Sequence, residues 1–357
     1  MTNEIDQALS ATAAVSEAAT EQESTKNSIP PELALDSLFK EKSRPGNARS
    51  KGFGVEAEAI ADQSIYSIPV GDLDVTEVEY QDRQNELPHG FFVEGERLVD
   101  IEMLGYDGET DLRIAALYNG NRIDIKNILV QALPLIIDTI GGMTISEIAK
   151  ASSITVAQLI EQMPLADALA ILIAGRVKNV GYDIAITDKC DNCKTLNKDE
   201  PAKGRPYHDI GALKMGLINN LEGRLAVQVD LEEGVTVLGS NYKSLLMRPM
   251  RVYEIAGMSK MERGKMDWAL AQAAIFNIVG CKETRNVRGK VFSDDMYQSM
   301  NGEAALRDRT KILKASETLQ GLSPQMSLSN DCGNCGNIWD SSLNWAALRN
   351  FLYDPAG

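Results

Sequence analysis

Histidine is scarce in this 357-residue chain, which contains only His89 and His208. Catalytic triads and catalytic metal sites both rely heavily on imidazole groups, so two histidines leave few ways to build either. The chain also has no phosphate-binding loop, no nucleophile elbow, no H-E-x-x-H zinc motif and no dinucleotide-binding fingerprint. The sequence therefore predicts a protein that is not an enzyme, without catalytic or organic-cofactor-binding residues.

Adjacent carboxylates do not alter this interpretation. Glu232-Glu233 and Asp294-Asp295 are pairs of neighbouring acids, but the chain has 51 acidic residues in all. In a chain of this composition such pairs are typical of a solvated surface.

Long apolar runs and an excess of basic residues are also lacking. There is no stretch of eighteen apolar residues and no basic-plus-apolar leader at the N-terminus, so neither a membrane nor secretion is predicted. Lys and Arg number 36 against 51 acidic residues, which gives a net charge of −15. This balance argues against a sequence-independent interaction with nucleic acid, which needs clustered positive charge. It is consistent with solubility or with a basic protein partner.

The chain does contain two C-x-x-C pairs, which hold four of its five cysteines. Two such turns facing each other supply four thiolates, a complete tetrahedral shell for a zinc ion. Because four cysteines leave no open position for water, a structural Zn²⁺ is predicted rather than a catalytic one. The predicted metal ligands are Cys190, Cys193, Cys332 and Cys335.

The two pairs differ in their neighbours. Gly333 lies inside the second turn and Gly336 follows it, and glycine tolerates the positive φ that directs backbone N–H groups at sulfur. The first turn lacks glycine and is followed by Lys194. The second pair is therefore the stronger metal-binding signal.

The spacing of the pairs leaves alternatives open. About 140 residues separate Cys193 from Cys332, whereas a compact zinc ribbon separates its pairs by about 15–20. One shared zinc would close a very long loop; the alternatives are two unconnected dithiols or two redox-active turns. A redox C-x-x-C normally opens a helix, but Cys190 follows a strand-like run and Cys332 follows a polar loop. Metal-type cysteine spacing fits a reducing cytoplasm better than a disulfide scaffold.

Composition divides the chain into three parts. Residues 1–60 are predicted to be a disordered acidic tail, because its beginning carries scarcely any large apolar side chain. Within it, residues 31–40 are predicted to form either a short amphipathic helix that docks on a partner or on the body of the chain, or a transient helix in a linker. Residues 61–180 are predicted to form an α+β body, and residues 181–357 a zinc-ribbon-like domain with a long helical insert. The fold class is thus α+β, a mixed helical and antiparallel-strand body with a zinc-ribbon-like element built on four cysteines.

Strand patterns begin the body. Residues 60–80 alternate in part and predict strands, and Phe91–Leu104 predicts two short strands around Gly95. Between them, Leu87–Gly90 predicts a turn. His89 is then a loop residue rather than a ligand.

Helical patterns follow. Asp111–Ile140 predicts a helical region that ends at Gly141-Gly142, and two short helices come next. Pro164 opens another helix with Asp167 in its first turn, where a carboxylate meets the positive end of the helix dipole.

The second half again begins with strand patterns. Arg224–Leu231, Val235–Leu238 and Leu245–Ile255 predict three strands, and this sheet is predicted to carry the metal site. Met258–Gly280 and Met296–Leu319 predict helices.

The end of the chain is predicted as a loop, a strand and a helix. Ser323–Asp331 is the loop, Ile338-Trp339 the short strand, and Trp345–Leu352 an amphipathic final helix. Cys281, the fifth cysteine, closes an apolar run and is predicted to be a buried core thiol.

Several short patterns occur in a characteristic order between about residues 85 and 355. Each joins a turn, strand or helix signal to particular residue types. They are a Leu-Pro-x-Gly segment (87–90), a Val-Asp-Ile-Glu-Met-Leu strand with an acidic helix start (99–111), an Asp-Ala-Leu-Ala-Ile-Leu-Ile-Ala-Gly-Arg helix (167–176), a Gly-Tyr-Asp strand leading into the first C-x-x-C, a Val-Asp-Leu strand end (229–231), and a C-x-x-C-G before a terminal Asn-Phe (350–351).

Through the order of these patterns, the chain resembles the baseplate hub assembly proteins of contractile-tailed, T-even-type bacteriophages. The resemblance implies a structural protein without catalysis, acting as a baseplate hub component or as its assembly chaperone. It implies other phage baseplate and hub proteins as partners, and a location in the host cytoplasm during assembly or in the tail baseplate of the virion. A competing hypothesis is a zinc-ribbon accessory protein that binds nucleic acid, although the residues around the first pair alternate in charge.

Overall fold

The computed structural model describes residues 65–105, 107–117, 125–198, 208–219, 221, 223–237, 239–255, 274–279, 303–343 and 351–352. The predicted tail (1–60), Cys281, residues 258–273 and residues 345–350 lie outside this part of the chain. All described residues belong to one unit, Phe53–Gly357. None of their helices combines the length and the apolar character needed to span a bilayer.

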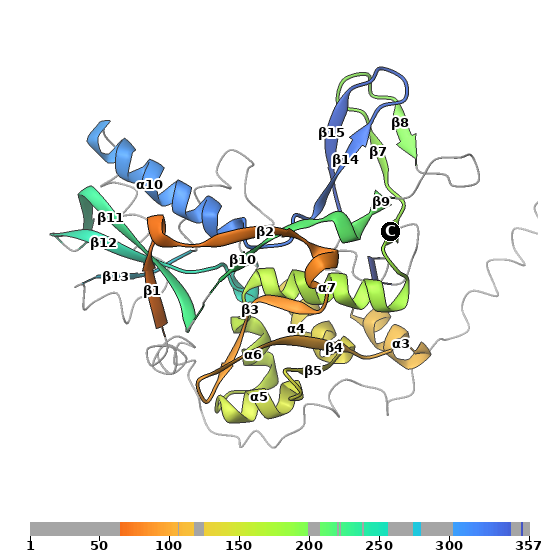
Figure 1. Ribbon diagram of the computed structural model, residues 1–357, viewed down its shortest axis with the longest axis horizontal. Helices are drawn as coiled ribbons and strands as arrows, with labels where there is room; N and C mark the ends of the chain where they lie inside the picture. Colours follow the sequence, from red (N-terminus) through yellow and green to blue (C-terminus); the bar gives the residue numbers. More distant parts are fainter. Residues whose placement is uncertain are drawn as a thin grey trace, which may run out of the picture. The chain divides into compact units, whose positions relative to one another are not determined.

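The mixed α+β class is confirmed. The first group of elements consists of a three-stranded sheet and five helices (Figure 1). The antiparallel sheet has the order β3-β4-β5. Its strands are β3 (Glu86–Val93), β4 (Glu96–Met103) and β5 (Ile137–Ile140). The helices are α3 (Gly108–Ala116), α4 (Ile125–Ile136), α5 (Ile145–Ala151), α6 (Val156–Gln162) and α7 (Leu165–Asn179).

Local sequence explains where the short helices begin. Thr144 and Thr155 each accept a hydrogen bond from the backbone N–H three residues later. The side-chain oxygens of Glu147 and Gln158 in turn accept a hydrogen bond from the backbone N–H of the same threonine, which completes a capping box at the start of each helix. Two of the N–H groups that each helix leaves unpaired are thereby satisfied.

Helix α7 is the centre of this part of the molecule. Every residue from Ala166 to Arg176 is buried, so the helix is enclosed on all sides. It packs against β3, β4 and α4. At its C-terminal end the buried Arg176 donates hydrogen bonds to the carbonyl oxygens of Asp183 and Phe351. The helix therefore connects the strand before the first cysteine pair with the end of the chain.

The predicted helical region Asp111–Ile140 is confirmed in its described part as far as Ile136 and is wrong in its last four residues. Helix α4 ends at Ile136, and Ile137–Ile140 is strand β5, which pairs with β4. Gly141 and Gly142, both with positive φ, form the turn after this strand instead of ending a helix. A short apolar run has the same composition in a buried strand and in a buried helix, so its pattern alone could not separate them.

The predicted turn at Leu87–Gly90 is also wrong, because these residues lie within β3. The register with β4 shifts between Glu86 and Phe91, and Gly90 has φ +73°. This bulge removes the backbone N–H groups of His89 and Gly90 from the ladder, and the buried carboxylate of Asp167 accepts both, at 2.8 and 3.0 Å. His89 is consequently a buried residue and not a loop residue.

A second sheet has the order β1-β11-β12-β13, with β1 parallel to β11 and the other pairs antiparallel. Figure 1 shows α10 beside this sheet, and a separate apolar core fills the space between them. The elements are β1 (Ile65–Pro69), β11 (Arg224–Val237), β12 (Ser240–Met247), β13 (Ile275–Ile278) and α10 (Glu303–Gln320). Strands β2 (Val75–Glu79) and β10 (Lys214–Ile218) form a further antiparallel pair.

Three predictions for this region need correction. The predicted strands Arg224–Leu231 and Val235–Leu238 are joined in one bulged strand, β11, which ends at Val237, and Leu245–Ile255 is a strand only as far as Met247. The bulge is stabilised from α10, since the buried Asp308 accepts the backbone N–H groups of Glu232, Glu233 and Gly234. Ile275–Ile278, predicted within a helix, is strand β13. The predicted helix 296–319 is confirmed as α10 over its described part.

The cysteines lie on a third set of strands, outside the sheet predicted to carry them. Hairpin β7–β8 holds the first pair and hairpin β14–β15 the second, and Figure 1 shows the two hairpins side by side. The predicted loop Ser323–Asp331 therefore ends in a strand, and the predicted strand at Ile338 is confirmed. The bounds are β6 (Asp183–Ile184), β7 (Thr187–Lys189), β8 (Leu196–Lys198), β9 (His208–Asp209), β14 (Ser327–Asp331) and β15 (Ile338–Ser342), with short 3-10 helices η3 (Val70–Asp72), η4 (Tyr80–Arg83) and η6 (Ile210–Ala212).

The larger apolar core draws on both sides of residue 180. It includes the buried residues of α4 and α7 together with Ile184, Val252 and Phe351. The division of the body into residues 61–180 and 181–357 stays a prediction.

Candidate metal centre

The first cysteine pair occupies the tight turn of hairpin β7–β8. The backbone N–H of Cys190 donates to the carbonyl of Thr195 at 3.0 Å, and the N–H of Lys194 donates to the carbonyl of Cys190 at 2.9 Å. Lys194 has φ +58°, a left-handed conformation that is unfavourable for a residue with a Cβ atom.

The second pair repeats this turn in hairpin β14–β15. Here the N–H of Cys332 donates to the carbonyl of Asn337 at 2.9 Å, and the N–H of Gly336 donates to the carbonyl of Cys332 at 2.8 Å. Gly336 has φ +67° and so occupies the position equivalent to Lys194. Gly333 does not have a positive φ, contrary to the expectation from the sequence.

The two turns have the same backbone geometry. Both turns have the same backbone hydrogen bonds and the same left-handed residue after the second cysteine. In the second turn, Gly336 adopts this left-handed conformation at little energetic cost. In the first turn, the surrounding structure must hold Lys194 in the same conformation. The sequence signal differs between the two turns, but the geometry does not.

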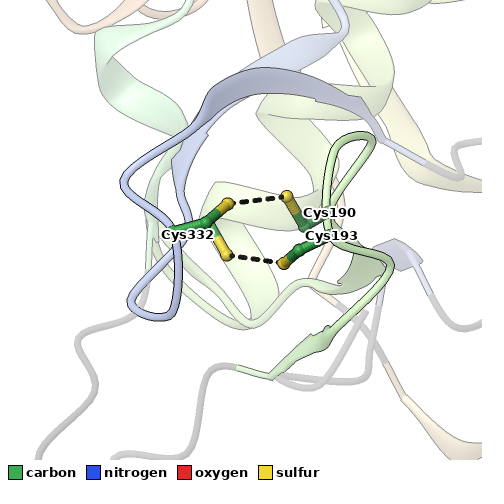
Figure 2. Close-up of side chains that lie close together, drawn as sticks. Cys190, Cys193 and Cys332 are labelled. Carbon is green, nitrogen blue, oxygen red and sulfur yellow. Dashed lines mark hydrogen bonds between the residues drawn. The ribbon is translucent and has the colours of Figure 1, made fainter.

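Figure 2 shows the two turns facing each other, with the close sulfur contacts running between the turns. The Sγ atoms of Cys190 and Cys335 are 3.7 Å apart, and those of Cys193 and Cys332 are 3.6 Å apart. All four Sγ atoms lie within 4.8 Å of one another. In a tetrahedral tetrathiolate zinc site, Zn–S bonds of about 2.3 Å place the sulfurs about 3.8 Å apart. The four predicted ligands thus form one cluster that could hold one metal ion.

Two asparagines donate hydrogen bonds to sulfurs of the cluster. Asn192 and Asn334 occupy the same position in the two C-x-x-C turns, and each reaches across to the other turn. The Nδ2 atom of Asn192 lies 3.8 Å from the sulfur of Cys335, and that of Asn334 lies 3.7 Å from the sulfur of Cys193. Hydrogen bonds to ligand sulfurs favour the thiolate and orient it toward a metal. The repeated Asn in the two motifs was the available signal for this role, and sequence reasoning did not use it.

Two thiols of the cluster have pKa values shifted in opposite directions. Hydrogen bonds from the hydroxyl and the backbone N–H of Thr195, and from the Asn334 amide, lower the pKa of Cys193 to about 5. A hydrogen bond from the Asn337 backbone lowers the pKa of Cys335, but desolvation and the other three sulfurs outweigh it and raise that pKa to about 11. Four thiols this close cannot all ionise unless a cation compensates their charge. The donor set therefore fits a soft divalent metal ion.

A polar contact also joins the two hairpins below the turns. Ser341 of β15 donates from its hydroxyl to the carboxylate of Asp188 in β7 at 2.7 Å, and Asn330 of β14 donates to the same hydroxyl at 2.6 Å. Trp339 packs with Cys190 and Cys332 in a small separate core. These contacts position the two turns, but the apolar surface that they bury is small.

The remaining candidates lie away from the cluster. Within the described residues, no other group of three or more His, Cys, Asp or Glu side chains could hold a metal ion. His208 is in β9 and His89 is buried in β3. Neither histidine contributes a ligand to the cysteine site.

No model of a known protein family, no curated protein and no solved structure matches this chain. The resemblance to baseplate hub assembly proteins accordingly rests on the order of the sequence patterns.

Proposed function

We propose that the four cysteines bind one structural zinc ion, and that the protein is a non-enzymatic component or assembly factor of the baseplate hub of a contractile-tailed phage. The observation that carries the proposal is the cysteine cluster, which joins two hairpins far apart in the sequence. A site filled by four thiolates has no open position for water or substrate, which supports a structural role.

Contacts among the patterned segments support the same proposal. Asp167, which begins the Asp-Ala-Leu-Ala helix pattern, accepts hydrogen bonds from the Leu-Pro-x-Gly segment through His89 and Gly90. Arg176, which ends that pattern, donates to Asp183 of the Gly-Tyr-Asp segment and to Phe351 of the terminal Asn-Phe. Residues that carry the resemblance are thus joined by buried hydrogen bonds, as expected if the pattern describes one type of fold.

The surroundings of the cysteines favour this role over the two alternatives. The exposed residues beside the turns include Asp191, Asp331 and Asp340 as well as Lys194, so the described residues next to the cysteines form no basic stripe for nucleic acid. A redox dithiol would pair its sulfurs within one C-x-x-C, whereas the close contacts here join different turns.

Disruption of this gene in the phage that carries it is expected to prevent assembly of complete baseplates. Electron microscopy of lysates should then show heads without functional contractile tails, and the wild-type protein supplied from a plasmid should restore them. Cys281→Ser should restore them equally well, because Cys281 is not one of the four clustered residues, whereas Cys332→Ser should not.

Normal tails in the absence of the protein would contradict the proposal. If the proposal holds, mass spectrometry of purified virions distinguishes a hub component from an assembly factor. A component of the hub is present in the virion, and an assembly factor is absent from it.

A further inference from the structure

A cavity of about 80 Å³ lies where β3, α6, β11 and residues 248–251 meet. Its polar lining is dominated by three arginines, Arg224, Arg248 and Arg251, together with His89. No carboxylate is among the described residues that line it. In a chain with a net charge of −15, a cavity lined by three arginines and no acid requires a physical explanation.

The three arginines differ in how their charge is compensated. Arg248 forms two hydrogen bonds to the carboxylate of Glu254, at 2.7 and 3.0 Å, and a third to the hydroxyl of Tyr253 at 2.7 Å. Among the described residues, the guanidinium groups of Arg224 and Arg251 form no ion pair with a carboxylate, although the charge of Glu254 also acts on Arg251, whose backbone N–H donates to that carboxylate. Burial lowers the pKa of both, and the positive charges of Arg248 and Arg224 help to lower that of Arg251 to about 9.

His89 adds an unsatisfied polar atom to the same cavity. Its Nδ1 atom lies 3.3 Å from the carboxylate of Asp167, while its buried Nε2 atom has no hydrogen-bond partner among the described residues. The side chain of His89 is only 5% exposed. A buried polar nitrogen without a partner is costly, so a ligand atom that paired with it would gain a favourable hydrogen bond.

Asp167 lies near His89 but is not among the residues that line the cavity. Its two oxygens already accept the backbone N–H groups of His89 and Gly90. Arg97 lies close enough for its charge to interact with that of Asp167, and it donates to the carbonyl oxygens of Pro88 and His89. The carboxylate of Asp167 is therefore engaged by the bulge of β3 and by the His89 ring.

We propose that this cavity binds an oxyanion, the phosphate or carboxylate group of a small ligand. Arg224 and Arg251 supply the positive charge, and His89 Nε2 supplies a further hydrogen-bonding position. The volume is several times the roughly 10–15 Å³ that a single water needs, so a tetrahedral anion fits. Phe91 and Met163 line the same space and provide an apolar wall for the body of the ligand. This site is separate from the cysteine cluster and does not depend on the function proposed above.

Calorimetric titration with inorganic phosphate and, separately, with phenylacetate tests the proposal at constant ionic strength set by sodium chloride. Saturable binding of one equivalent of either anion is expected for the wild type. Arg224→Met and Arg251→Met should each weaken it about tenfold or more, because each removes a charge-assisted hydrogen bond. Arg307→Met is the matched control, since Arg307 is exposed on α10 and does not line the cavity, and it should bind as the wild type does.

Nuclear magnetic resonance of the wild type provides a test that does not depend on how the variants fold. The chain has only two histidines, so the ring nitrogens give two sets of signals. Titration with the bound anion should shift the His89 signals and leave those of His208 in place. Binding of phosphate alone or phenylacetate alone identifies the ligand group. No saturable binding of either anion, unchanged affinity in both arginine variants, or an unmoved His89 signal would overturn the proposal.

Discussion

Removal of the metal, by chelation or by Cys332→Ser, is expected to abolish the hydrogen-exchange protection of both cysteine hairpins. The relevant amides are those of Cys190, Lys194, Cys332 and Gly336, which form the four turn hydrogen bonds. The hairpins share a small apolar core around Trp339 and a few hydrogen bonds such as that from Ser341 to Asp188, so we expect the metal to supply most of the energy that joins the two turns. Binding energy in a structural zinc site is folding energy, and protection should fall at least about a hundredfold.

Helices α4 and α7 provide the internal reference for this experiment. They bury their side chains in the larger core, and their amides should stay protected in the metal-free protein. Cys281→Ser is the matched control for loss of a thiol and should change neither region. Unchanged protection of the hairpins would show that the thiols are not structural. A uniform loss along the whole chain would instead indicate one cooperative unit that depends on the metal.

Asp167→Ala is expected to lower the free energy of unfolding by about 3–5 kcal/mol, since each unsatisfied buried polar group costs about 1–3 kcal/mol. The carboxylate is fully buried and accepts the N–H groups of His89 and Gly90, and the bulge of β3 offers them no other partner. Denaturant unfolding monitored by circular dichroism measures the change.

Asp308→Ala supplies a second instance of the same effect, because Asp308 is also buried and satisfies three N–H groups at the bulge of β11. Both variants should be far less stable than Asp107→Ala, which removes an exposed helix cap. If Asp167→Ala unfolds at the same denaturant concentration as Asp107→Ala, the bulge does not depend on the buried carboxylate.

The elements with strong local signals could be predicted from the sequence. The helix after Pro164 and the strands on either side of Gly95 follow directly from apolar periodicity and from turn chemistry. Short apolar runs such as Ile137–Ile140 and Ile275–Ile278 could not be assigned, since their place in a sheet depends on partner strands elsewhere in the chain. Pairing with strands that are distant in the sequence decides whether such a segment is helix or strand.

The bulge at Leu87–Gly90 shows a different limit. Proline and glycine in this segment do mark an irregular backbone, as expected. What makes it a bulged strand and not a turn is a carboxylate 78 residues further along the chain. No local pattern contains that information.

The candidate metal site could be predicted in its residues but not in its surroundings. Spacing within each C-x-x-C was sufficient to select the four cysteines, which the structure brings together. The sheet that was expected to carry them was wrong, because β7 and β8 have only three residues each and the pairing of the two hairpins depends on contacts between distant parts of the chain. The left-handed conformation of Lys194 was also unexpected, since tertiary structure imposes it against the preference of the residue.

The central claim, that one metal ion joins the two cysteine turns, is tested most directly by elemental analysis of the purified, reduced protein. About one equivalent of zinc per chain is expected in the wild type and in Cys281→Ser, and a marked loss is expected in Cys332→Ser. Less than about half an equivalent in metal-replete wild-type protein would contradict the claim. Two equivalents would contradict it as well, because each turn would then hold an ion of its own.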